Sequence, residues 1–340
     1  MQAIQIDRYG GPEVLVRREV PLPEIGPADA LVKLSHSGIN FMDIHTRQGQ
    51  FAASRTYPVR LPVTLGIEGA GIVEAVGPEV RDVQVGDRVA YCISWGSFAQ
   101  YAAVPAWRLA KLPDNISTET AAALMFHGYT AHYLVNDVGR LGPGATCLVL
   151  AASGGIGQLL VQLAKRKGAR VLAVTSTPEK AVVAARRGAD ATLLYEEGAF
   201  AERARGHTGG RGVDVVFDPV GIATLRHSMR ATRTAGLVVN YGAVSGPVRD
   251  LDPIELGEAG SLYLTRPRLA DHLQDGAMVQ RRASELFSDV LLGALKVDIA
   301  GRYGLDEAHV GLAALEERRQ IGKPVLVLDD VSRGSTSMCW

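Results

Sequence analysis

Residues 146 to 165 read TCLVLAASGGIGQLLVQLAK, and they give the clearest indication of the fold. The apolar run Thr146–Ala151 predicts a short buried strand, and Ile156–Lys167 predicts a helix. A glycine-rich turn joins the two. A strand, a glycine-rich turn and a helix in this order form the fingerprint of a dinucleotide-binding site, although Ala152 replaces the first glycine of the usual GxGxxG pattern.

Each part of this turn has a physical role. Gly154 allows the backbone to approach a pyrophosphate, and Gly157 allows the helix to pack closely on the strand. The helix N-terminus presents unpaired N–H groups and a partial positive charge to the phosphates. A tight turn that binds no nucleotide is the alternative, but a second strand follows at the spacing that the fingerprint requires. The turn residues expected to bind the cofactor are Ser153, Gly154, Gly155, Ile156 and Gly157.

The tip of the second strand predicts which cofactor is bound. The strand Arg170–Val174 is followed by Thr175-Ser176-Thr177-Pro178-Glu179-Lys180. An NAD site usually places an acid at this tip to hold the ribose 2′-hydroxyl. Here Thr175 and Ser176 offer hydroxyls and Lys180 offers a cation, which suit a 2′-phosphate. The sequence therefore favours NADPH over NADH, the alternative being that Lys180 is only a solvated helix residue.

The elements that follow alternate between strand and helix, which predicts an α/β fold with a doubly wound parallel sheet of Rossmann type. The first 110 residues instead read as short strands separated by turns, which predicts a mostly β domain. We expect a discontinuous catalytic domain at 1–124 and 267–330, a nucleotide-binding domain at 125–266 and a disordered tail at 331–340. The expected later elements are strands 191–195, 213–217 and 236–240 and helices 178–187, 200–206 and 222–232.

Composition excludes several classes of protein. Thirty-six basic residues balance thirty-six acidic ones, so no net field favours nucleic acid or an anionic membrane. The sequence contains no run of about 18 apolar residues, so no membrane span is expected. The first residues do not resemble a signal peptide. Cys92, Cys147 and Cys339 show no CxxC spacing and are interpreted as free thiols, so we expect a cytoplasmic protein.

Motifs along nearly all of residues 1 to 328 carry a family resemblance. They are YGGPEV at 9–14, GINFMD at 38–43, LGIEGAG at 65–71, GDRV at 86–89, AASGGIG at 151–157 and GSLYLTRP at 260–267. The chain resembles the zinc-independent quinone oxidoreductases of the medium-chain dehydrogenase/reductase superfamily. The resemblance implies a GroES-like catalytic domain and transfer of hydride or electrons from NADPH to a quinone.

No metal is expected. Zinc-dependent relatives have a cysteine at the position of Asn40 and a histidine at that of Ile67, and neither residue here supplies a thiolate or imidazole. Asp43, His45 and Glu68 remain nearby without a Cys-His pair.

The resemblance also implies further site residues. Asn40 and Thr130 would lie beside the nicotinamide and donate hydrogen bonds, and His45 and Phe51 would line the acceptor cleft, so these four are the candidate catalytic residues. Lys323 is a candidate late cationic contact, the alternative being an exposed lysine before a strand. The remaining cofactor contacts implied are Tyr195, Gly242, Leu264 and Arg266.

Three departures leave the acceptor open. His45 and Phe51 stand where the family often has tyrosines, and His127 stands where the bacterial pattern tends to have lysine. The second hypothesis is therefore an NADPH-dependent enoyl or 2-alkenal reductase, with Tyr57, Tyr91 or His45 as the proton donor. The third is a non-catalytic NADPH-binding protein.

By resemblance the protein is also expected to form a homodimer through an edge strand of the nucleotide-binding sheet. The candidate is Gly236–Asn240 with the loop that leads to Tyr263.

Overall fold

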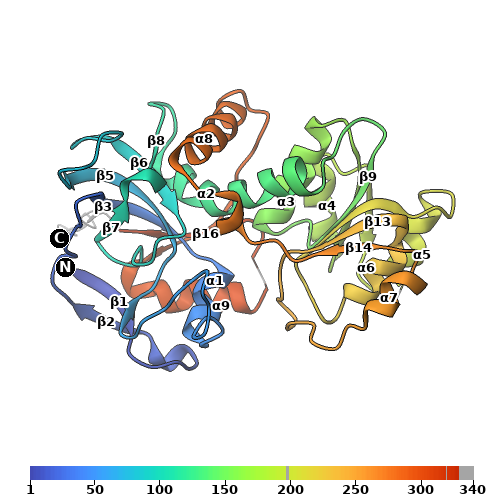
Figure 1. Ribbon diagram of the computed structural model, residues 1–340, viewed down its shortest axis with the longest axis horizontal. Coiled ribbons are helices and arrows are strands. Elements are labelled where there is room, and N and C mark those ends of the chain that lie inside the picture. Colours follow the sequence, from blue (N-terminus) through green and yellow to red (C-terminus); the bar gives the residue numbers. More distant parts are fainter. Residues whose placement is uncertain (197–198, 319, 329–340) are drawn as a thin grey trace, which may run out of the picture.

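The computed structural model describes residues 1–196, 199–318 and 320–328, so the disorder expected for 331–340 falls outside the described residues. The chain forms two lobes, and the long helices α2 and α3 lie between them (Figure 1).

One lobe is built on a six-stranded parallel sheet in the order β11-β10-β9-β12-β13-β14. This order confirms the expected Rossmann-type fold. Every residue of β9 is buried, because helices cover both faces of a parallel sheet. The strands are β9 (Thr146–Leu150), β10 (Arg170–Thr175), β11 (Ala191–Leu194), β12 (Val213–Asp218), β13 (Thr232–Asn240) and β14 (Tyr263–Thr265). The helices are α3 (Gly155–Arg166), α4 (Pro178–Arg186), α5 (Ala199–Gly206), α6 (Leu225–Ala231) and α7 (Pro253–Glu258).

The far edge of this sheet differs from the prediction. Gly236–Asn240 is not an edge strand, because β13 lies between β12 and β14, and the edge is β14. The helix predicted at 222–232 is shorter, since Thr232 already belongs to β13 and pairs with Val213. A strand of only three residues such as β14 has too little periodicity to be recognised from sequence.

The other lobe is mostly β, as expected, and the last strand that the structure describes lies inside its larger sheet. The order is β15-β16-β3-β5-β6-β8, and β7 also pairs with β3. The strands are β3 (Asp29–Gly38), β5 (Glu68–Val76), β6 (Arg88–Cys92), β7 (Tyr101–Pro105), β8 (Ala110–Lys111), β15 (Ile299–Gly304) and β16 (Lys323–Val327). A small sheet of β2 (Val16–Glu19), β1 (Gln2–Ile6) and β4 (Val63–Thr64) lies beside it. The helices of this lobe are α1 (Phe41–Arg47), α8 (Gly276–Leu291) and α9 (Ala308–Glu316).

Helix α2 (Thr118–Tyr133) connects the lobes. It packs on β3, β5 and β6 of the larger sheet in the mostly β lobe, on α8, and on α3 of the nucleotide lobe. It runs on into a π-helical turn, Leu134–Val138. Among the described residues, no helix combines the length and apolar character needed to cross a membrane.

Candidate functional site

The residues expected to bind the cofactor gather along one edge of the parallel sheet. Parallel strands all present their carboxyl ends at the same edge, and nucleotides bind there at the point where strand order reverses. That point lies between β9 and β12. Most of the expected residues follow the carboxyl end of a strand: 153–157 follow β9, Ser176 and Lys180 follow β10, Tyr195 follows β11 and Gly242 follows β13. Thr175 is the last residue of β10, Leu264 lies in β14 and Arg266 comes just after it.

The glycine turn after β9 has the geometry that a diphosphate needs. A Cβ on Gly157 would lie 2.2 Å from the carbonyl oxygen of Ala151, so only glycine fits between strand and helix. Gly154 is the N-cap of α3, and no side chain caps it, so the first N–H groups of the helix remain available to a ligand. The turn therefore fits the pyrophosphate of a dinucleotide.

The tip of β10 presents a preformed cationic contact. The Lys180 ammonium donates to Ser176 Oγ at 3.2 Å and to the carbonyl oxygen of Arg318 at 3.0 Å. Among the described residues two of its three hydrogens are thus engaged, which leaves the third to meet a 2′-phosphate. The side chain of Thr175 points inward and donates to the Thr177 carbonyl at 3.3 Å.

The remaining nucleotide-lobe candidates also lie at this edge. Tyr195 is half-buried, with its ring centroid 5.9 Å from that of Phe200. Gly242 lies so close to Pro219 that a Cβ would be 2.2 Å from its carbonyl oxygen. Arg266 donates to the carbonyl oxygen of Asn240 at 2.9 Å, which fixes the guanidinium at the end of β13.

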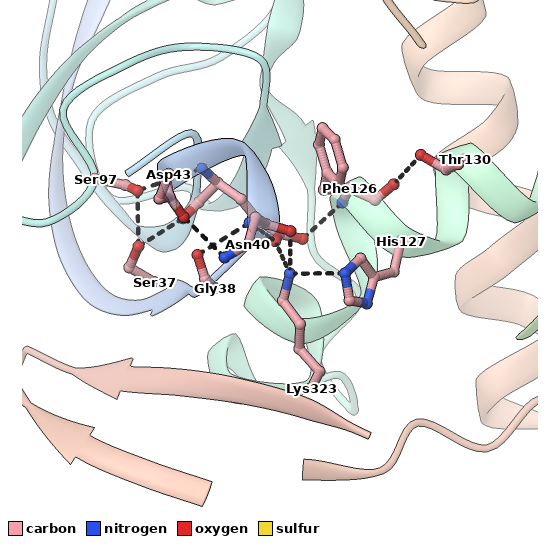
Figure 2. A network of polar contacts seen from close by, with 10 residues as sticks. Ser37, Gly38, Asn40, Asp43, Ser97, Phe126, His127, Thr130 and Lys323 are labelled. Atoms are coloured by element: carbon pink, nitrogen blue, oxygen red, sulfur yellow. Dashed lines mark hydrogen bonds and ion pairs between the residues drawn. The ribbon is translucent and has the colours of Figure 1, made fainter. Parts of the chain in front are cut away.

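Across from this edge, a buried polar cluster lies at the junction of the lobes (Figure 2). Its centre is Glu68, which is fully buried at the start of β5. One carboxylate oxygen accepts from the Phe126 N–H at 2.6 Å. The other accepts from Asn40 Nδ2 at 3.0 Å and from Lys323 Nζ at 2.7 Å. Lys323 is 1% exposed, so the exposed alternative for this lysine is wrong.

Burial also shifts the pKa values of ionisable groups in and around this cluster. Asp43 accepts from the Asn40 N–H at 2.8 Å, and burial raises the pKa of its carboxyl to about 7. Burial, and then the charge of Lys323, hold the pKa of His127 well below its ordinary value, so the imidazole is neutral. Burial also lowers the pKa of Lys323, an effect that the nearby Glu68 carboxylate opposes.

Asn40 and Thr130, expected as donors to the nicotinamide, already donate within the protein. The two amide hydrogens of Asn40 go to the Gly38 carbonyl, at 3.1 Å, and to Glu68. The Thr130 hydroxyl donates to the Phe126 carbonyl at 2.7 Å. Both groups retain free lone pairs, so as they stand they can only accept hydrogen bonds from a ligand.

The structure brings His45 and Phe51 together with a third aromatic residue. The ring centroids are 6.2 Å apart for His45 and Phe51 and 5.7 Å apart for Phe51 and Tyr57, both edge-on. Burial lowers the pKa of His45, and Arg266 contributes to the same shift. Tyr91, in contrast, is fully buried in β6.

The described part of the chain contains no group of three or more His, Cys, Asp or Glu side chains that could hold a metal ion. At the two decisive positions, Asn40 carries a side-chain amide and Ile67 is a buried aliphatic residue.

The sequence reasoning did not find the ion pair between Lys323 and Glu68. These residues are 255 positions apart, and no local pattern links them. The single hint was an acid enclosed by apolar and glycine residues at 65–71, which is an unusual place for an unpaired charge.

The chain is similar to known proteins over almost its whole length. Residues 26–114 match the alcohol dehydrogenase GroES-like domain, and residues 155–266 match the zinc-binding dehydrogenase family. A quinone oxidoreductase of Pseudomonas aeruginosa is 39% identical over 325 residues, which cover 95% of this chain and 98% of the relative. A 2-haloacrylate reductase of Burkholderia is 35% identical, with 96% and 99% covered.

Among solved structures, the quinone oxidoreductase of Escherichia coli complexed with NADPH is similar to this chain. Its TM-score is 0.92 at 35% identity, with 96% of this chain and 100% of that one covered. The chain therefore belongs to the quinone oxidoreductase family of the medium-chain dehydrogenase/reductase superfamily.

Proposed function

We propose that the protein is an NADPH-dependent quinone oxidoreductase. The observation that carries this proposal is the edge of the parallel sheet, where an uncapped helix N-terminus lies beside a strand tip of hydroxyl residues, with Lys180 of α4 donating to Ser176 at that tip. NADPH bound there supplies the hydride. The relative from Escherichia coli, which has the same fold, is a quinone oxidoreductase complexed with NADPH.

The protein's own residues would hold the two reactants. The turn 153–157 binds the diphosphate, Ser176 and Lys180 bind the 2′-phosphate, and Tyr195, Gly242, Leu264 and Arg266 contact the rest of the cofactor. Asn40 and Thr130 face the nicotinamide as acceptors. The edge-on rings of His45, Phe51 and Tyr57 offer an apolar wall to a planar acceptor. A quinone accepts hydride readily, so positioning it suffices, and the residue types at 40 and 67 supply no zinc ligand.

The test is acceptor-dependent oxidation of NADPH by the purified protein, followed by loss of absorbance of the reduced nicotinamide. We expect turnover with 1,4-benzoquinone and weaker turnover with an α,β-unsaturated ketone. Activity with the unsaturated ketone alone would remove the quinone assignment. Tight NADPH binding with no oxidation in a broad acceptor panel would identify a non-catalytic binding protein.

The second candidate function is reduction of an activated alkene, which the similarity to a 2-haloacrylate reductase favours. That reaction needs a proton donor. Tyr57 fits this role better than Tyr91, because its oxygen accepts from the Ala270 N–H and its own hydrogen has no acceptor among the residues that the structure describes. Burial raises the pKa of Tyr57, so its phenol is protonated at neutral pH. Loss of alkene reduction but not quinone reduction in Tyr57→Phe would support this second activity.

We also propose the division into a catalytic domain at 1–124 with 267–330 and a nucleotide-binding domain at 125–266, which agrees with the two sheets. The proposed homodimer forms through the β14 edge, where Tyr263 is 66% exposed. Cys92 and Cys147 are buried free thiols, which supports a cytoplasmic location. The acceptor is a small molecule, and the balanced charge favours neither nucleic acid nor membrane as a partner.

A further inference from the structure

We propose that Glu68 and Lys323 are positioning residues that fix which way the Asn40 amide faces. This inference rests on the proposed function in one respect, namely that Asn40 borders the nicotinamide. The amide of an asparagine can turn over by half a rotation, which exchanges an acceptor for a donor at the same place. A site that orients a nicotinamide therefore needs a device that selects one of the two orientations.

The contacts of Asn40 supply this selection. Glu68 and the Gly38 carbonyl both accept from the amide nitrogen, and Lys323 Nζ donates to Oδ1 at 2.5 Å. In the reversed orientation the amide oxygen would face two acceptors, and the NH₂ group would face an ammonium. Every one of the three contacts would then be repulsive. With Asn40 1% exposed, no bulk water compensates for them.

Lys323 is itself held in place by its full set of partners. An ammonium has three hydrogens, and the three acceptors here are Asn40 Oδ1, Glu68 Oε2 and His127 Nε2, the last at 3.3 Å. Because Nε2 accepts, the proton of the neutral His127 ring belongs on Nδ1. Figure 2 shows Lys323 reaching the cluster with Asn40 and the His127 ring as its neighbours.

The same cluster is tied to the dinucleotide turn. Gly322, next to Lys323, forms a backbone bridge with Gly154. The His127 ring lies against Gly155, where a Cβ would be 2.3 Å from Nδ1. The orientation of Asn40 is therefore fixed relative to the turn that would hold the diphosphate, although Asn40 itself belongs to the other lobe.

The decisive variant is the double substitution Glu68→Gln with Lys323→Met, which removes both charges and leaves no unpaired ion. The Phe126 N–H keeps the oxygen end of the introduced glutamine side chain toward itself, so its nitrogen end faces the nitrogen of the Asn40 amide. The Gly38 carbonyl still favours the original orientation of that amide while the introduced glutamine favours the reverse, so neither orientation is selected any longer. We expect the affinity for NADPH to fall about tenfold, as for the loss of one hydrogen bond. The affinity for 2′,5′-ADP, which lacks the nicotinamide, should not change, and kcat with 1,4-benzoquinone should fall by a similar factor.

A matched control is Asp137→Asn with Arg282→Met, which neutralises an ion pair between a buried arginine and a half-buried aspartate, far from Asn40 in sequence and between other elements. It should alter the melting temperature without altering the ratio of the two affinities. An unchanged ratio in the folded Glu68→Gln/Lys323→Met protein would overturn the proposal. If wild type binds no NADPH, the proposed function fails instead.

One measurement needs no variant and covers the case in which the double variant does not fold. Nitrogen NMR of the wild-type protein should show His127 as a neutral ring protonated at Nδ1. A proton on Nε2 would contradict the arrangement around Lys323 and with it the proposal.

Discussion

Replacement of Lys180 by alanine should remove most of the preference for NADPH over NADH. The ammonium is already held by Ser176 and by the Arg318 carbonyl, so its remaining hydrogen is available to the proposed 2′-phosphate without further ordering of the side chain. A charge-assisted hydrogen bond contributes roughly 1.5–3 kcal/mol. We use the lower end because Lys180 lies near the surface. A loss of about 1.5 kcal/mol corresponds to about a tenfold fall in kcat/KM for NADPH.

The assay is the ratio of kcat/KM for NADPH to that for NADH, measured with 1,4-benzoquinone. The NADH value should not change in Lys180→Ala, because NADH has no 2′-phosphate. Lys33→Ala, which removes an exposed lysine from β3 in the other lobe, is the control for nonspecific charge effects. Ser176→Asp should go further and favour NADH, because it restores an acid at the strand tip. A ratio within twofold of wild type in Lys180→Ala would refute the reasoning.

Three other predictions concern stability and assembly. Gly157→Ala places a Cβ 2.2 Å from the Ala151 carbonyl, so it should destabilise the fold by about 1–3 kcal/mol and weaken NADPH binding; unchanged melting and titration curves would contradict this. Asp43→Asn should flatten the pH dependence of stability. The pKa of Asp43 is raised to about 7, so its protonated form contributes stability below about pH 4 that is lost as pH rises through 7. The loss is up to about 4 kcal/mol. The free energy of unfolding in urea, measured for both proteins across this pH range, would depend equally on pH if the reasoning is wrong. Tyr263→Glu puts a charge on the β14 edge and should shift a dimer to a monomer in sedimentation, whereas a dimer that persists would place the interface elsewhere.

The strand, turn and helix of the proposed nucleotide site could be predicted because they are local in sequence. A strand, a turn and a helix share 20 residues, and Ser176 and Lys180 are four positions apart at the start of a helix, where neighbouring turns bring such side chains together. The edge of the sheet could not be predicted in the same way. Whether Gly236–Asn240 lies at the edge depends on a three-residue strand that comes more than 20 positions later.

The polar cluster was the least predictable part. The contact of Lys323 with Glu68 depends on β16 lying beside β3 in the larger sheet, and only the complete topology sets that position. A lysine before a strand is usually exposed, and pattern alone offers no reason to bury this one. The roles of Asn40 and Thr130 also depend on which acceptors their side-chain hydrogens bind, and only the three-dimensional contacts reveal these acceptors.

The position of β16 between β15 and β3 has a consequence for biosynthesis. The strands of the nucleotide lobe come from one continuous segment, residues 146–265, which can collapse as soon as it has left the ribosome. The first lobe begins earlier in the chain, yet its larger sheet stays open until residues 323–327 are made and inserted beside β3. The half translated first is therefore completed last, and a nascent chain stalled before residue 323 would leave residues 36–38 of β3 unpaired on one side and open to chaperones or to other nascent chains.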